Sequence, residues 1–307
     1  MTRSVNHFET SLLRYTNAMK EGKMMDDSTF FSSETSVRDV NFNIIKYNKS
    51  CQDILASLKS LECFLCDFEN LSSGRDIIFF HDRVFFLSKI NISLECTMGS
   101  IISCCEYGCI ADANTLLRKY RDDLFFYLYI LVYDSEKKSN SASEILPEIE
   151  RNIESWLQNE LKNLNISMVL KAIALSSDLN DAVKKYKLKS DFDRISKRLN
   201  NFVHSKGYWF YNQPSNGYKG SELAIEMTKN CNDAKYVTVV FIFLVMLCSP
   251  LATMSTDYID YLDCGIQPPD GSQYWVAPFI QKFLTENESL ISENCLQYLR
   301  DNTSMEI

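Results

Sequence analysis

The segment from Ala111 to Tyr133, ADANTLLRKYRDDLFFYLYILVY, restricts the fold of this chain more than any other part of the sequence. Large apolar side chains recur in it at helical spacing, and they are Leu117, Tyr120, Leu124, Tyr127, Leu128 and Leu131. Residues spaced in this way share one face of an α-helix, and the opposite face here is charged. The pattern predicts a long helix at the centre of the molecule.

Glycine and proline are both rare, with 9 and 6 residues in a chain of 307. Because tight turns depend on these two residue types, their scarcity disfavours β-sandwiches, β-barrels and glycine-rich phosphate loops. Apolar residues make up 46% of the chain, which is enough to form a real core. The sequence therefore predicts an all-α fold, a bundle of many helices.

Other helices are expected where apolar residues recur with the same period. These stretches are 54–68, one or two helices between 75 and 109, 144–163 and 166–175. The polar run SEKKSNSAS, residues 135–143, is predicted to be an exposed connector.

The chain divides into three regions by character. Residues 1–35 are polar and irregular and are predicted to be a lead-in segment. Residues 36–207 carry the helical patterns described above. Residues 208–307 begin with the turn-rich sequence around 211–220 and are predicted to form a C-terminal helical region packed on the preceding domain.

The most apolar part of the C-terminal region is YVTVVFIFLVMLC, residues 236–248, which follows a helix-like segment at 221–230. Thirteen residues without a charge are too few to span a bilayer, which takes about 20. We expect a buried helix that Pro250 ends, with a membrane span that extends to Met254 as the alternative.

A proline-rich loop followed by a helix is expected at 264–284. Its aromatic residues Tyr274, Trp275 and Phe279 are predicted to cover the core. The alternative is that they are exposed, where they would stack on bases or hold a partner chain.

Charge is distributed unevenly along the chain. The formal net charge of −8 argues against broad, nonspecific binding to nucleic acid or to an anionic membrane. The segment from Lys184 to Lys206 is the exception, because it carries eight Lys or Arg residues against Asp191 and Asp193. A cleft formed by this segment would attract a phosphodiester.

Within that segment, RLNNFVHSKG at 198–207 closes a predicted helix. Ser190 and Asp193 resemble a capping box at its start, and Gly207 suits the left-handed position after its end. The residues expected to point inward are Ile195, Leu199, Phe202 and Val203. Arg198, Asn201 and His204 follow one another at steps of three and lie on the flank of that apolar face.

Arg198 and His204, with five residues between them at the end of a helix, resemble the Arg-x4-6-His signature of HEPN domains, which are helical modules that include many metal-independent ribonucleases. The sequence LNNFVHSKG is similar to the closing helix of several members. ANTLLRKYRDDLF, at 113–125, resembles the helix that supplies partner polar groups. The resemblance covers roughly residues 40–207.

This resemblance implies a homodimer in which two copies of the motif face one cleft, and RNA cleavage by attack of its own 2′-hydroxyl. His204 would serve as acid or base, and Arg198 would stabilise the phosphorane. The residues that would support them are Asn200, Asn201, Arg118 and Asp122, and those that would bind RNA are Arg194, Lys197 and Lys206. A role as a toxin or abortive-infection effector in anti-phage defence, with an antitoxin or other protein partner, follows by analogy.

Two other interpretations stay open. Arg75 and His81 have the same spacing, although we expect that pair to be structural because 77–80 is an unbroken apolar run. The second alternative is a non-catalytic helical partner that regulates or scaffolds a separate effector. It is favoured by Leu199, which stands where many HEPN members carry a polar residue after the arginine.

The eleven cysteines show no metal-binding pattern. Cys63 and Cys66 have the spacing of a zinc knuckle but lie in an apolar helical run without a second pair, and Cys104, Cys105 and Cys109 are likewise predicted to be helical. We expect reduced and mostly buried thiols, no metal and no cofactor. With no apolar run near the N-terminus, these thiols favour a cytoplasmic location.

Overall fold

The computed structural model describes residues 36–73, 77–80, 83–139, 144–158, 160, 165–203 and 219–307. Helices dominate these residues, which confirms the all-α prediction. The elements in chain order are α2 (Val37–Tyr47), α3 (Lys49–Ser72), β1 (Ile77–Phe80), β2 (Arg83–Phe86), α4 (Ser88–Glu106), α5 (Ile110–Lys138), α6 (Leu146–Leu157), α7 (Ile166–Ile173), α8 (Ser177–Lys185), α9 (Leu188–Val203), α11 (Gly220–Cys248), η2 (Pro250–Thr253), α12 (Asp257–Asp263), η3 (Ser272–Tyr274), α13 (Pro278–Asn287), η4 (Glu288–Leu290) and α14 (Cys295–Asn302).

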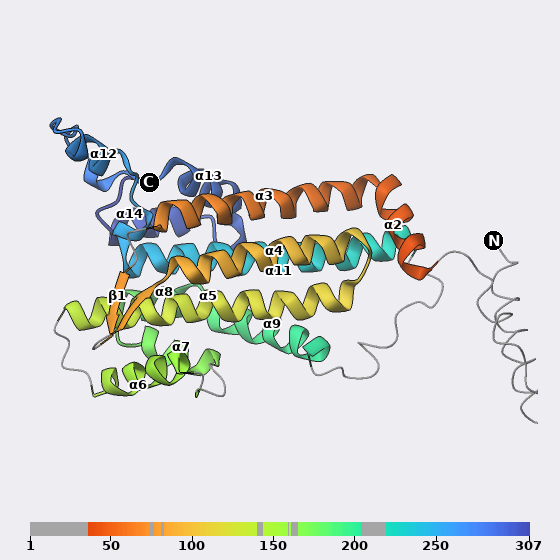
Figure 1. The fold of residues 1–307 in the computed structure, drawn as a ribbon, viewed down its shortest axis with the longest axis horizontal. Helices are drawn as coiled ribbons and strands as arrows, with labels where there is room; N and C mark the ends of the chain where they lie inside the picture. The colour runs from red at the N-terminus through yellow and green to blue at the C-terminus, as the bar shows by residue number, and fades with distance from the viewer. Residues whose placement is uncertain are drawn as a thin grey trace, which may run out of the picture.

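The long helices α3, α4, α5 and α11 lie side by side and form the body of the molecule (Figure 1). The chain reverses direction from α3 to α4, since Lys59 in the first half of α3 pairs with Glu106 at the end of α4 at 2.9 Å. Residues 107–109 then connect α4 to α5, and the chain reverses direction again. On the other side of α5 lie the shorter helices α6, α7 and α9 (Figure 1).

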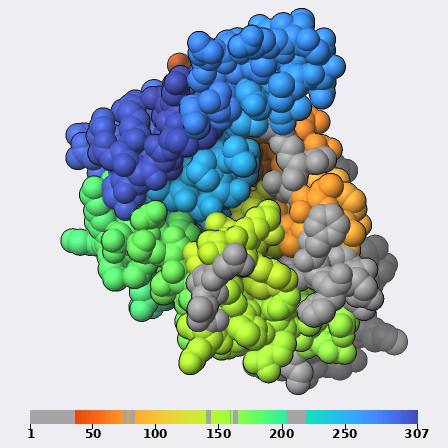
Figure 2. Space-filling view, turned by 90° about the vertical axis from the view of Figure 1, so that its left-hand side faces the viewer, coloured from red at the N-terminus to blue at the C-terminus, as the bar shows by residue number. Residues whose placement is uncertain are grey.

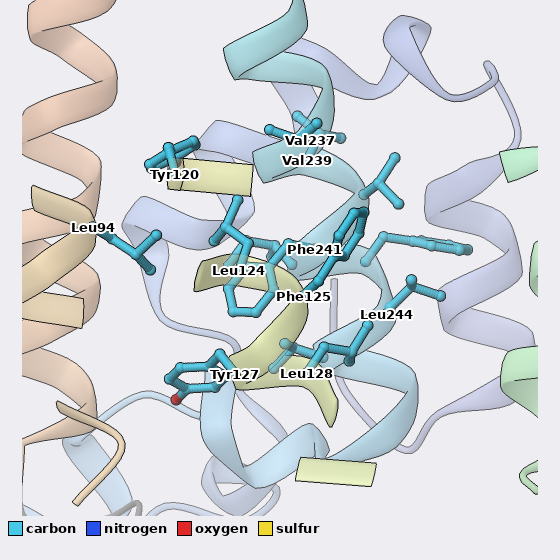
Figure 3. Packing of buried hydrophobic residues seen from close by; sticks show 14 of the residues in the cluster. Leu94, Tyr120, Leu124, Phe125, Tyr127, Leu128, Val237, Val239, Phe241 and Leu244 are labelled. Atoms are coloured by element: carbon cyan, nitrogen blue, oxygen red, sulfur yellow. The ribbon is translucent and has the colours of Figure 1, made fainter. Parts of the chain in front are cut away.

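The predicted central helix is α5. All residues from Leu124 to Tyr133 are buried, so this part of the helix is surrounded on every side, and the charged residues of α5 lie in the turns before and after it. Phe241 of α11 packs edge-on against Tyr127, with ring centroids 5.2 Å apart, and against Phe68 of α3 at 5.9 Å. Figure 3 shows Phe241 beside the residues of α5 in this core.

The two helical segments expected at 221–230 and 236–248 are one continuous helix, α11. The intervening residues 231–235 contain neither glycine nor proline, so nothing in the sequence interrupts the hydrogen-bond ladder. Burial of every residue from Tyr236 to Met246 confirms the buried helix, which ends at Cys248, two residues before Pro250. α11 is long and apolar enough to cross a membrane, but its apolar window is 78% buried inside the protein, as in the core helix of a soluble protein.

The prediction of helices alone between 75 and 109 is wrong in its first part, where β1 and β2 pair as an antiparallel hairpin before α4 begins. The two strands, IIFF and RVFF, consist almost entirely of β-branched and aromatic residues and are two residues apart in sequence. Ile78 is buried opposite Phe85, and the Phe85 ring meets Trp156 of α6 edge-on at 5.5 Å. The hairpin therefore packs over the α5–α6 side of the bundle.

The connector predicted at 135–143 begins later than expected, because α5 continues to Lys138. Lys138 pairs with Asp134 at 2.6 Å, and Lys137 pairs with Glu150 of α6 at 3.0 Å. Lysine and glutamate are good helix formers, so an exposed polar run without glycine or proline can continue a helix. Residues 140–143 lie outside the described residues, and α6 ends at Leu157 rather than at 163.

The C-terminal helices α13 and α14 cover the α3–α11 side of the bundle (Figure 1). Phe279 and Phe283 of α13 pack against Phe64 of α3, with ring centroids 5.6 and 4.0 Å apart. Phe279 therefore covers the core as predicted and Trp275 is half-buried, whereas Tyr274 is exposed.

One hydrophobic core joins the parts of the chain on both sides of the boundary predicted at 207/208. Buried residues of α11, α13 and α14 belong to the same cluster as those of α3, α4 and α5. The boundary itself and the lead-in at 1–35 lie outside the described residues, so the division into regions stays a prediction.

Candidate functional site

The helix that carries Arg198 is α9, and its apolar face packs on α5. Phe192, Ile195, Leu199 and Phe202 are buried, and the Phe192 ring meets Phe125 edge-on at 4.8 Å. Val203 was expected to point inward but is 38% exposed, because it lies at the edge of this face in the last turn.

The predicted capping box at the start of α9 is wrong. The helix begins at Leu188, which is fully buried, so Ser190 lies inside the first turn and its N–H donates to the Lys187 carbonyl at 3.0 Å. Lys187 adopts a positive φ of 53° and turns the chain from α8 into α9. Because Leu188 is buried, the helix begins two residues before Ser190, the polar residue that was predicted to be its cap.

The side chain of Arg198 extends from α9 toward α5 and α11 rather than into solvent. Its Nε donates to Oδ2 of Asp233 on α11 at 2.7 Å, and its Nη1 donates to Oδ1 of Asn114 on α5 at 2.7 Å. The Asp233 side chain is only 10% exposed, so the ion pair is largely withdrawn from water. One side chain thus joins three helices.

Asn114 is fully buried and receives two donors at one oxygen. Besides Arg198, Nδ2 of Asn230 donates to Oδ1 of Asn114 at 3.3 Å. Nδ2 of Asn114 in turn donates to the Ile110 carbonyl at 2.9 Å. Two buried atoms at this point, Nη2 of Arg198 and Oδ1 of Asn230, have no hydrogen-bond partner among the described residues. A donor and an acceptor thus stay unsatisfied where a buried polar group normally has a partner.

Of the two predicted supporting residues on α5, Arg118 reaches α9 and Asp122 binds Arg118. Nε of Arg118 donates to Oδ2 of Asp122 at 2.8 Å, and its Nη1 donates to Oδ1 of Asn200. The neighbouring Arg121, which is almost fully buried, binds the other carboxylate oxygen of Asp122 at 2.6 Å and donates to Oγ of Ser196 at 2.7 Å. Burial lowers the pKa of Arg121, and the negative charge of Asp122 opposes this effect.

These groups form two separate hydrogen-bonded networks, which together we name the polar cluster. The first, around Arg198, joins α5, α9 and α11. The second, around Arg118 and Arg121, joins α5 and α9. The members of the polar cluster are Asn114, Arg118, Arg121, Asp122, Ser196, Arg198, Asn200, Asn230 and Asp233. The predicted residues Arg198, Asn200, Arg118 and Asp122 all belong to it.

A pocket of about 490 Å³ opens beside the polar cluster, between α9 and α11. Three cationic side chains line it, Arg194, Arg198 and Lys229, against the two carboxylates of Asp191 and Asp233. The Tyr236 hydroxyl donates to Oδ2 of Asp191 at 3.1 Å, and burial together with this carboxylate raises the pKa of Tyr236. The pocket therefore has a small excess of positive charge and several hydrogen-bond donors, which suits an anionic group.

Of the remaining predicted site residues, Arg194 lines the pocket, and the others lie outside the polar cluster or outside the described residues. His204 and Lys206 lie outside the described residues, as do Arg75 and His81. Lys197 is exposed and Asn201 is half-buried on the outer side of α9. Arg194 is 60% exposed and approaches Asp191 at 3.4 Å and Asp233 at 3.9 Å.

Sequence reasoning missed five members of the polar cluster, namely Asn114, Arg121, Ser196, Asn230 and Asp233. A signal was present for two of them. Asn230 and Asp233 are polar residues one turn apart that lie close to the apolar positions Leu223, Met227 and Ala234 on α11, and buried polar residues require partners. Their partners lie far away in the sequence, so the pattern alone could not name them.

No group of three or more His, Cys, Asp or Glu residues that could hold a metal ion occurs in the described part of the chain. All eleven cysteines are free. Cys51, Cys105, Cys231 and Cys295 are buried, but Cys63, Cys96 and Cys264 are exposed, so the expectation of mostly buried thiols is too broad. Burial raises the pKa of the Cys105 thiol, which disfavours the reactive thiolate there.

The chain matches no protein-family model, no curated protein and no solved structure. The resemblance to HEPN domains therefore stays a prediction from the residues alone.

Proposed function

We propose that the protein is a metal-independent endoribonuclease with its active site at the C-terminal end of α9. The observation that supports this most is the pocket between α9 and α11, which has a small excess of positive charge and is lined by Arg198. In sequence, His204 follows directly after Val203, the last residue of α9. The resemblance assigns catalysis to this end of the helix.

The reaction needs only groups of this chain and the RNA. The 2′-oxygen of the RNA attacks the adjacent phosphorus, and its proton passes to a base. The 5′-oxygen leaves with a proton from an acid, so the products carry a 2′,3′-cyclic phosphate and a 5′-hydroxyl. An imidazole that titrates near neutral pH suits both proton transfers, and His204 is our candidate.

Arg198 would stabilise the charge that develops on phosphate in the transition state. Arg198 lines the pocket between α9 and α11 and brings its positive charge to it, although its Nη2 is buried and has no hydrogen-bond partner among the described residues. Arg194 and Lys229 line the same pocket and add positive charge. We further propose a cytoplasmic homodimer with two motifs at one cleft and a role in anti-phage defence, both of which rest on the resemblance.

The test is incubation of the wild type and His204→Ala with total RNA in EDTA, followed by analysis of the fragment ends. We expect the wild type to leave cyclic phosphate ends and the variant to lose at least about a hundredfold in rate, as expected for loss of a general acid or base. His81→Ala is the matched control and should cleave at the wild-type rate. Equal cleavage by the wild type and His204→Ala would refute the assignment.

A second candidate function is a non-catalytic scaffold for a separate effector. The specific observation in its favour is the ion pair of Arg198 with Asp233, which occupies the guanidinium within the bundle. This candidate predicts a stable complex with the protein encoded beside it, unchanged by His204→Ala. Loss of that complex in His204→Ala, together with RNA cleavage by the wild type, would exclude it.

A further inference from the structure

Residues 256–270 form a projection that contributes little to the core, and we name it the acidic knob. It consists of α12 and the turn that follows, and Figures 1 and 2 show it standing out from the bundle. None of the residues of α12 is buried, and residues 260–267 are all exposed. The knob carries four aspartates, Asp257, Asp260, Asp263 and Asp270, and no lysine or arginine occurs between Lys235 and Lys282.

The tip of the knob is a defined structure rather than an irregular loop. Gly265, with a φ of 67°, closes α12, and its N–H donates to the Leu262 carbonyl at 2.9 Å. The N–H of Ile266 donates to the Tyr261 carbonyl at 2.9 Å, which completes a Schellman motif. Such a cap holds Leu262 and Ile266 in fixed positions relative to each other.

This fixed tip presents apolar side chains to solvent. Leu262 is 51% exposed and Ile266 is 56% exposed, and both stand among the aspartates. An ordered apolar tip surrounded by charge of one sign is the pattern of a binding element, because exposing such a tip gives no stability to the monomer. Its partner must offer an apolar pocket with a basic rim.

The chain itself contains such a pocket between α7, α8 and α9, and we name it the basic pocket. Its volume is about 660 Å³, and its apolar floor includes Leu170, Ile173 and Val183. Lys184, Lys187 and Lys189 stand at its rim against Asp193, and all three lysines are exposed. Lys187, with its positive φ, lies at the turn between α8 and α9.

The knob cannot fill the pocket of its own chain. In Figure 1 the knob lies at the upper left, while α7 and α9 lie on the lower side of the bundle. Figure 2 also separates the blue knob from the green residues of α7 to α9. The complementary surfaces of one molecule therefore remain available to two others.

We propose that a second copy of this chain binds through these surfaces, with the acidic knob of one molecule seated in the basic pocket of the next. Leu262 and Ile266 enter the apolar floor, and the aspartates approach the three lysines. The contact uses different surfaces on its two sides, so it is heterologous and extends head to tail. It uses none of the residues assigned to RNA cleavage and is independent of that proposal.

Two pairs of charge reversals test this contact by sedimentation velocity over a wide range of protein concentrations. The knob variant carries Asp260→Lys and Asp263→Lys, and the pocket variant carries Lys187→Glu and Lys189→Glu. Raising the salt concentration should weaken association of the wild type, because complementary exposed charges are screened. We expect each variant to weaken the association of the wild type at least about tenfold.

An equimolar mixture of the two variants should associate again, because the native knob of one meets the native pocket of the other. The reversed knob and the reversed pocket left at the two ends of such a pair again carry opposite charges, so association of the mixture can extend beyond pairs. The control, Asp53→Lys with Asp67→Lys on α3, changes the net charge as much as the knob variant and should associate like the wild type. Circular dichroism checks that all variants are folded.

The proposal is overturned by a wild type whose mass does not rise with concentration, or by association that persists in both variants. Failure of the mixture to associate would also overturn it. Leu262→Ser with Ile266→Ser offers an independent test of the apolar contact, because it leaves every charge in place. That variant should associate at least about tenfold more weakly than the wild type.

Discussion

At the scale of single residues, Arg198 links three helices through one side chain. It joins α9 to α11 through Asp233 and to α5 through Asn114. A guanidinium suits this position because its donors lie in one rigid plane and can meet acceptors on two helices at once. The same geometry leaves Nη2 as the donor that is still without a partner among the described residues.

We predict that Asp233→Asn destabilises the protein by about 2 kcal/mol, because it leaves the Arg198 charge largely buried without its counter-charge. This loss of stability is smaller than the loss on breaking a fully buried ion pair, since the Arg198 side chain is 23% exposed. Urea unfolding of the variant and of Asp53→Asn, an exposed aspartate on α3, measures the difference. Equal stability of the two variants would show that the ion pair contributes nothing.

The sequence indicated that Arg198, Asn200, Arg118 and Asp122 belong together. The structure joins Arg118 to Asp122 and Asn200 but places Arg198 in a separate network with Asn114 and Asp233. The sequence did not indicate that Arg198 turns toward α11. The direction of that side chain is decided by Asp233 and Asn114, which lie 35 and 84 positions away in the chain. Helical periodicity describes one helix at a time and contains no information about such distant partners.

At the scale of elements, α11 determines how the other helices pack. It contacts α3 and α5 along its length, and Phe241 meets an aromatic ring from each of them. The uncharged run at 236–248 predicted the burial of α11, and Pro250 predicted where this helix ends. The β1–β2 hairpin was not predicted, because short apolar runs have no periodicity that separates a strand from a buried helix.

We predict that Phe241→Ala destabilises the protein by about 3–4 kcal/mol, because it removes a buried aromatic side chain and leaves a cavity between α3, α5 and α11. Ile225→Ala is the matched control on the same helix. Ile225 is 55% exposed, so its truncation should change stability by less than about 0.5 kcal/mol. Denaturant unfolding followed by circular dichroism compares the two variants, and similar losses would contradict the packing described for α11.

At the scale of the whole molecule, one core includes residues from α2 to the C-terminal helices. The buried thiol of Cys295 is part of it, and the half-buried Cys248 packs against it. Withdrawal from water raises the pKa of Cys295 to about 11 and that of Cys248 to about 12, from an ordinary value of 9.0. The folded protein therefore keeps these protons at pH values where the unfolded chain releases them. Stability from these groups is complete below pH 9 and is lost as the pH rises above it.

We predict that the melting temperature falls between pH 9 and pH 11, with each of these thiols costing up to about 1.4 kcal/mol per pH unit. Thermal unfolding at a series of pH values measures the fall. Cys295→Ala should show a shallower fall than the wild type, while Cys63→Ala, at an exposed thiol, should follow the wild type. Identical slopes in all three proteins would contradict the burial of Cys295.

The position of α11 in the chain also has a consequence for synthesis on the ribosome. α11 packs against α3 and α5, and it ends at Cys248, after α3, α4, α5 and α9 have all been made. Until it emerges, the apolar residues that pack on it have no partner, and a nascent chain of more than two hundred residues must keep them from associating with other chains. The core can therefore be completed only after α11 has been synthesised.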